Sequence, residues 1–224
     1  MNIRDIIRMA RSITDSETLG LVVPRSQVVA AYGSRIDSKA EECVSILAPK
    51  FPQGFQIVQV TPPLLELTKK RTGTGIKIRR VESEEDNPLY GFAEPDASGA
   101  IVRYRADLNL CWRRFTVAKE LFHLYADIAA DPRPRTSDAV VQAAMNARKV
   151  VPNDGLQLDD EVVAFYLTLE YLMPWRLRDQ FLALRDCAAT TYQIAKVFMV
   201  PLPFVEHMCD GEYAELSHRI NNNV

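Results

Sequence analysis

One stretch near the middle of the chain constrains the fold more than any other. It covers residues 114–124 and reads Arg-Phe-Thr-Val-Ala-Lys-Glu-Leu-Phe-His-Leu. Apolar residues recur in it at the spacing of an α-helix, which predicts a central helix over about residues 112–126. Its apolar side is formed by Phe115, Ala118, Phe122 and Tyr125.

The same helix carries three polar residues, Lys119, Glu120 and His123. Lys119 and His123 are four residues apart and lie one above the other, with Glu120 beside them. Zinc peptidases use this layout in the motif His-Glu-x-x-His, where two histidines hold the metal and the glutamate acts as base on the bound water. Here a lysine stands in place of the first histidine. Because Glu-x-x-His also occurs on ordinary solvated helices, the flanking residues have to decide its meaning.

Those flanks resemble the ImmA/IrrE family of zincin-like metallopeptidases, whose core reads Arg-Phe-Thr-x-Ala-His-Glu-x-x-His. In that family the third zinc ligand is a glutamate on a later helix, Glu-x-x-Ala-Asn-x-Phe-Ala, which runs into Leu-Leu-Met-Pro. Residues 161–174 resemble that helix, and the resemblance as a whole covers about residues 20–200. The positions in register are Glu161, Ala164, Met173 and Pro174, whereas Phe165 replaces the Asn and Thr168 the second Ala.

The resemblance implies an α+β, zincin-like fold, in which a sheet of three or four strands packs on the central helix and the C-terminal half is helical. It implies a domain over residues 1–190 and a helical extension over residues 191–224. Members of the family are often encoded with bacterial stress responses or mobile elements such as prophages, and they act on helix-turn-helix repressors, sometimes by cleaving them. The implied role is therefore transcription regulation, through binding of a protein partner such as a helix-turn-helix regulator at a vestigial peptidase cleft.

Lysine at the ligand position changes the chemistry of such a site. A catalytic zinc takes three protein ligands and a water, and a protonated lysine has no lone pair to offer. Only His123 and Glu161 would then remain as metal ligands. We expect instead that the Lys119 ammonium takes the place of the metal and pairs with Glu161, sharing its charge with Glu120. Glu120 would then be a vestigial general base, in a pseudoenzyme that needs no cofactor.

The alternative is an active zinc endopeptidase that cleaves a transcriptional repressor. It requires a third ligand from Asp127, Glu170 or His207, none of which has a counterpart in the family pattern. Glu170 lies nine residues after Glu161, about two and a half helical turns, and so faces roughly the opposite way. His207 is also expected to be an ordinary surface or packing residue.

Composition and charge limit the cellular setting. The chain has 224 residues and a net charge of −2, which gives no general affinity for nucleic acid. No run reaches the ~18 apolar residues of a membrane span, and the N-terminus lacks the apolar core of a signal peptide. The cysteines are widely spaced, form no Cys-x-x-Cys pair and read as buried apolar residues of a reducing compartment, at Cys43, Cys111, Cys187 and Cys209. These features predict a cytoplasmic protein.

The remaining elements follow from periodicity and from turn residues. Helices are expected over 2–13, from about 26, and over 38–48, 62–68, 138–149, 161–172 and 175–187. Strands are expected over 55–60, 75–81, 89–93 and 100–105, the last two joined by a hairpin at residues 96–99.

The tail fits a helix-turn-helix pattern over residues 191–209, with Met199 where a glycine usually stands. The reading helix, residues 203–209, has no Arg or Lys, although a DNA reader needs cations for phosphates and forked donors for bases. We therefore favour a helical packing unit over a DNA-binding regulator.

Two further expectations concern other parts of the chain. Residues 221–223 are expected to fray. Arg113 and Arg114 are candidates for contact with an acidic partner.

Overall fold

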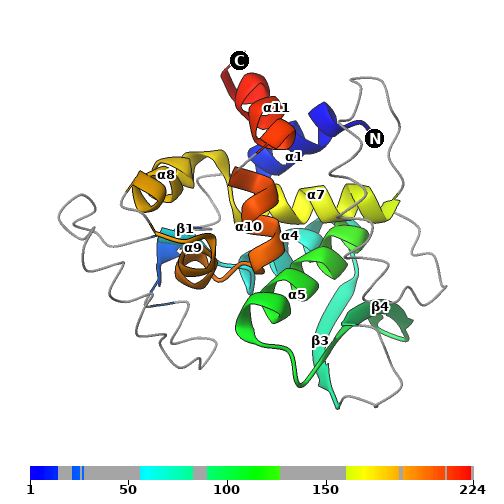
Figure 1. The fold of residues 1–224 in the computed structure, drawn as a ribbon. Coiled ribbons are helices and arrows are strands. Elements are labelled where there is room, and N and C mark those ends of the chain that lie inside the picture. Colours follow the sequence, from blue (N-terminus) through cyan, green and yellow to red (C-terminus); the bar gives the residue numbers. More distant parts are fainter. Residues whose placement is uncertain are drawn as a thin grey trace.

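The computed structural model describes residues 1–14, 22–25, 27, 56–82, 90–126, 160–186, 189–209 and 211–222. In this part of the chain the fold is α+β, with a small mixed sheet packed against helices and a mostly helical C-terminal half (Figure 1). In chain order the elements are α1 (Ile3–Thr14), β1 (Val22–Pro24), β2 (Gln56–Val58), α4 (Pro63–Thr72), β3 (Gly75–Val81), β4 (Gly91–Asp96), β5 (Gly99–Arg105), α5 (Leu110–Tyr125), α7 (Asp160–Leu172), the 3-10 turn η2 (Trp175–Leu177), α8 (Arg178–Asp186), α9 (Thr191–Phe198), α10 (Leu202–Cys209) and α11 (Gly211–Asn222).

The main sheet has three strands in the order β3-β5-β4. Strand β3 runs parallel to β5, and β4 runs antiparallel to it across the predicted hairpin. Gly99 opens β5 with a φ of 137°, and a Cβ there would lie 2.0 Å from the carbonyl oxygen of Gly75. Only glycine fits this close approach of β5 to β3. The expected strand at 55–60 does not join this sheet, because β2 pairs with β1, a short strand that the sequence did not predict.

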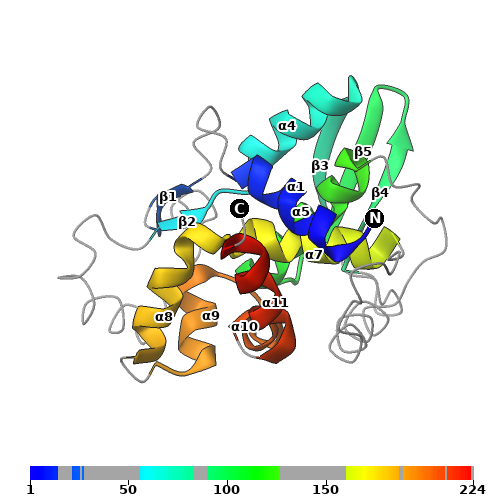
Figure 2. The same ribbon diagram turned by 90° about the horizontal axis from the view of Figure 1, so that it is seen from above.

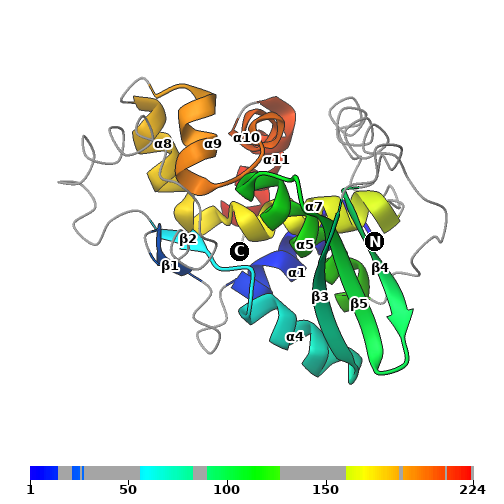
Figure 3. The ribbon, with the colours of Figure 1, turned by 90° about the horizontal axis from the view of Figure 1, so that it is seen from below.

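Two layers lie on either side of α7 (Figures 2 and 3). The sheet and α4 lie on one side, and the helices α8 to α11 lie on the other. Helix α5 packs against α7 as well as against strands β4 and β5. Aromatic contacts join the two helices, with ring centroids 5.9 Å apart for Phe115 and Phe165 and 5.4 Å apart for Phe122 and Tyr171. Helix α5 is thus enclosed, and every residue from 114 to 123 is buried.

Helix ends follow local rules where the structure describes them. Asn109 caps α5 by accepting a hydrogen bond from the Trp112 amide at 3.1 Å. Helix α4 starts with Pro63 and continues to Thr72, four residues beyond the expected end, because the left-handed Gly73 (φ 68°) stops it there. The expected helix at 175–187 begins as the 3-10 turn η2 and continues as α8.

Several expectations are corrected or lie outside the described residues. Helix α11 runs through Asn222, so residues 221 and 222 are helical rather than frayed. Cys111 and Cys209 are only partly buried, which contradicts the expectation of fully buried thiols. The helices expected over 38–48 and 138–149 fall outside the described residues, as do Cys43 and Cys187 and, apart from residue 27, the helix expected from about residue 26. None of the described helices is both long and apolar enough to span a membrane.

Candidate functional site

The polar residues expected at the site do come together, between α5 and the first turn of α7. Lys119 Nζ donates a hydrogen bond to Glu161 Oε2 at 3.1 Å and lies 3.0 Å from Glu120 Oε1. His123 Nε2 lies 3.2 Å from the other Glu161 oxygen, Oε1. Lys119, Glu120, His123 and Glu161 are called the ion cluster below. The predicted ion pair between Lys119 and Glu161, shared with Glu120, is confirmed.

The ion cluster is buried rather than part of a solvated helix face. Lys119 is 7 % exposed, and Glu120 and His123 are each 5 % exposed. The Glu161 side chain is the most accessible of the four at 18 %. Charges withdrawn from water to this degree need close partners of opposite sign, and the distances above supply them.

The charges fix the protonation state of the lysine. Burial by itself lowers the pKa of Lys119, but the negative charges of Glu120 and Glu161 outweigh it and hold this pKa above its ordinary value. Burial likewise raises the pKa of Glu161, but His123 and Lys119 together bring it down to about 2. At neutral pH the pair is therefore an ammonium and a carboxylate.

A zinc ion does not fit this arrangement. His123 and Glu161 could both donate to a metal, and His123 Nδ1 is buried with no hydrogen-bond partner among the described residues. The third position, however, is taken by an ammonium without a lone pair, 3.1 Å from the carboxylate that would have to bind the metal. Because the pKa of Lys119 is raised, deprotonation to a neutral amine ligand is disfavoured.

Replacement ligands are also missing from the described part of the chain. There, no three His, Cys, Asp or Glu side chains are grouped so as to hold a metal ion. Glu170 faces away from Glu161, as predicted, and accepts a hydrogen bond from Tyr213 on α11. His207 stacks on the same tyrosine, with ring centroids 4.9 Å apart, and so is the packing residue that we expected. Asp127 lies outside the described residues.

Arg114 has a structural role that the sequence did not predict. It is fully buried, so the expectation that it faces an acidic partner is wrong. Its guanidinium donates to the carbonyl oxygens of Phe198 and Met199, each at 2.8 Å, and to that of Val58. One side chain of α5 thereby joins the end of α9 to strand β2. Arg113 lies over the ring of Tyr104, 5.6 Å from its centroid.

The tail forms two short helices, α9 and α10, in the region of the helix-turn-helix pattern. Met199 ends α9 in the left-handed conformation (φ 55°), which explains why a glycine is usual at this position. Helix α10 reads Leu-Pro-Phe-Val-Glu-His-Met-Cys and carries no lysine or arginine. Its buried residues, including Phe204 and Val205, face the protein. This arrangement supports a packing role for α10.

A second buried polar group lies at the other end of α7, and only Glu170 among its members was singled out from the sequence. Glu170 Oε1 accepts hydrogen bonds from Tyr213 Oη at 2.6 Å and Ser217 Oγ at 3.2 Å. Ser217 in turn accepts one from the Arg178 guanidinium at 3.2 Å. We call Glu170, Tyr213, Ser217 and Arg178 the carboxyl–hydroxyl cluster. Its partners come from residues up to 47 positions apart, and no local spacing could have indicated them.

Comparisons with models of known protein families, with curated proteins and with solved structures found no match to this chain.

Proposed function

We propose that this chain is a regulatory protein of the ImmA/IrrE type, whose peptidase-like site has lost its metal and serves to bind a protein partner. The observation that carries the proposal is the position of Lys119 Nζ, 3.0 Å from Glu120 and 3.1 Å from Glu161. In the family pattern, position 119 belongs to a zinc ligand and Glu161 to another.

The ion cluster is suited to stabilising the local structure rather than to catalysing peptide hydrolysis. Peptide hydrolysis at a zincin site needs a metal-bound water with a lowered pKa. An ammonium cannot coordinate water in that way, and Glu120 is engaged with it as a counter-ion. The cluster does preserve the packing of α5 against the first turn of α7, so the surface around Glu161 keeps a defined shape.

The partner that we propose is a helix-turn-helix transcriptional regulator, in a bacterial stress or mobile-element setting. This choice depends on the two sequence motifs that resemble the family, around residues 114–123 and 161–174. A role as a DNA-binding regulator has less support, because α10 offers no cation to phosphates.

The test compares the zinc content of the purified full-length protein with that of Lys119→His and Lys119→Gln. We expect the native protein and Lys119→Gln to lack stoichiometric zinc, and Lys119→His to bind it through the restored imidazole together with His123 and Glu161. Lys119→Gln is the matched control, because it removes the ammonium without supplying a ligand. Elemental analysis after dialysis at neutral pH, with circular dichroism to check folding, gives the measurement.

Two outcomes would overturn the proposal. Stoichiometric zinc in the native protein would favour the alternative, an active zinc endopeptidase directed at a repressor. A folded Lys119→His variant that takes up no zinc would remove the basis for a peptidase ancestry. If both zinc results are as expected, mass spectrometry of a mixture with candidate helix-turn-helix regulators should find complexes of intact chains.

A further inference from the structure

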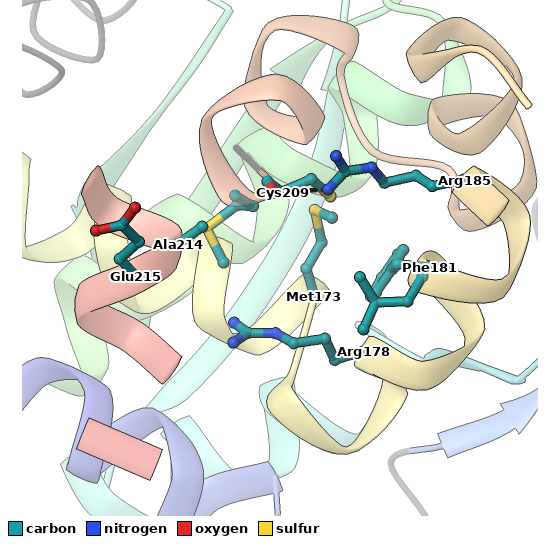
Figure 4. Close-up of a pocket in the computed structure, with 9 residues that line it drawn as sticks. Met173, Arg178, Phe181, Arg185, Cys209, Ala214 and Glu215 are labelled. Atoms are coloured by element: carbon teal, nitrogen blue, oxygen red, sulfur yellow. Dashed lines mark hydrogen bonds between the residues drawn. The ribbon is translucent and has the colours of Figure 1, made fainter. Parts of the chain in front are cut away.

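A pocket of about 270 Å³ lies among the C-terminal helices, away from the ion cluster. It is bounded by the end of α7, by α8, and by the facing ends of α10 and α11 (Figure 4). Met173, which borders it, follows Glu161 by twelve residues, which is about 18 Å along a helix. The pocket is therefore a separate site, and its use goes beyond the proposed function.

The pocket combines an apolar wall with positive charge. Met173, Phe181 and Met208 supply buried apolar surface, whereas Arg178 and Arg185 supply two guanidinium groups. In Figure 4 the two arginines lie on opposite sides of the Met173 side chain. Among the described residues that line the pocket, the one carboxylate is that of Glu215, which is exposed. The described lining residues thus carry a net charge of +1, from two arginines and one glutamate.

Arg178 has donors to spare in this pocket. A guanidinium has five N–H donors, and Arg178 is half-buried. Among the described residues its one hydrogen bond goes to the neutral hydroxyl of Ser217, and no carboxylate lies within ion-pair distance of it. Arg185, by contrast, is exposed and donates to the carbonyl oxygen of Cys209 at 2.9 Å. A forked, partly desolvated guanidinium beside an apolar wall is the setting that binds a carboxylate in bidentate fashion.

The volume limits the size of the ligand. At ~30 Å³ for each water-sized group, the pocket holds about nine heavy atoms, near the lower end of ligand sites. We propose that this pocket binds a small amphipathic monocarboxylate, with an apolar body of about six or seven carbons against Met173 and Phe181 and its carboxylate on the Arg178 guanidinium. The exposed Glu215 disfavours ligands of higher negative charge.

The test uses three probes with the same apolar chain, octanoate, 1-octanol and octylamine, titrated into the full-length protein by calorimetry. We expect octanoate to bind about tenfold or more tightly than 1-octanol, because a charge-assisted hydrogen bond contributes that much, and octylamine to bind weakest. Equal binding of octanoate and 1-octanol, or no octanoate binding at millimolar concentration, would overturn the proposal.

Two variants locate the ligand. Arg178→Gln should weaken octanoate about tenfold or more and leave 1-octanol nearly unchanged. Its matched control is Arg176→Gln, an exposed arginine two residues away that does not line the pocket. Since Arg178→Gln also removes the hydrogen bond to Ser217, Ala214→Phe provides an independent test by filling the pocket from α11. Ala214→Phe should abolish the binding of octanoate, and unchanged octanoate affinity in either folded variant would contradict the assigned pose.

Discussion

Helix α7 carries a glutamate near each end, Glu161 partly buried and Glu170 buried, and the two are stabilised in different ways. Glu161 lies in the ion cluster, where Lys119 and His123 face its two oxygens. Glu170 lies in the carboxyl–hydroxyl cluster, where its contacts are the hydroxyl groups of Tyr213 and Ser217. The Lys119 ammonium compensates the charge of Glu161 directly, whereas Glu170 accepts hydrogen bonds from neutral hydroxyl groups.

The two settings drive the pKa values of these carboxyl groups in opposite directions. His123 and Lys119 overcome the effect of burial and lower the pKa of Glu161 to about 2. Burial dominates at Glu170 and raises its pKa, although Tyr213 and Arg178 act against the shift. Glu161 is therefore charged over the whole physiological range, whereas the environment of Glu170 favours its protonated form. The ion cluster is accordingly the more sensitive of the two to the loss of a charged partner.

The largest expected effect comes from replacing Lys119 of the ion cluster with methionine, an uncharged side chain of similar length. Lys119→Met leaves the buried Glu120 and the partly buried Glu161 as neighbouring carboxylates without the ammonium between them. We expect a loss of about 3–5 kcal/mol in the free energy of unfolding. Urea unfolding at neutral pH measures it. The double variant Lys119→Met/Glu161→Gln should recover part of this loss. If the single and double variants are equally unstable, the two side chains are not energetically coupled.

The next effect, about 3 kcal/mol at most, is a difference in pH dependence. Between pH 4.5 and about 2 the native state binds fewer protons at Glu161 than the unfolded state, so its contribution to stability is present above pH 4.5 and is lost as the pH falls. Glu170 has a raised pKa, so its protonated form favours the native state and its contribution weakens as the pH rises above 4.5.

Glutamine variants separate these two contributions. Glu161→Gln should flatten the acid loss of stability, and Glu170→Gln should instead flatten the decline towards neutral pH. Urea unfolding from about pH 3 to pH 7 gives both slopes. Slopes of the same sign at the two sites would contradict the contrast between them.

The smallest effect tests the neutral donors. Tyr213→Phe removes the hydroxyl that lies 2.6 Å from Glu170 but keeps the ring stacked on Tyr166 and His207. We expect a loss of about 2 kcal/mol, because a buried carboxyl group loses its shortest hydrogen bond. Ser217→Ala, which removes the longer bond at 3.2 Å, should cost about 1 kcal/mol and is the matched comparison by thermal or urea unfolding. A larger loss for Ser217→Ala would reverse the assigned order.

Local spacing determined how far the ion cluster could be predicted. Lys119 and His123 are one helical turn apart, so their common face follows from the sequence alone. Their meeting with Glu161, which is 42 residues from Lys119, was predicted through the family resemblance, and the 3.1 Å contact agrees with it. Strands β3, β4 and β5 were predictable from alternation and from the turn between β4 and β5.

Long-range packing determined what the sequence could not predict. Arginines are mostly exposed, so nothing local indicates that Arg114 is fully buried against carbonyl groups from two distant segments. Strand β1 has three residues, too few for a period of two to appear. The partners of Glu170 come from a helix more than 40 residues later and were likewise missed.

The contacts of Arg114 have a consequence for how the sequence can vary. Three of its acceptors are main-chain oxygens, at Val58, Phe198 and Met199. Side chains at those three positions can therefore be exchanged without deleting an acceptor, while position 114 requires a forked donor of that reach. Among related sequences we therefore expect position 114 to remain arginine, while the residues at the three acceptor positions vary.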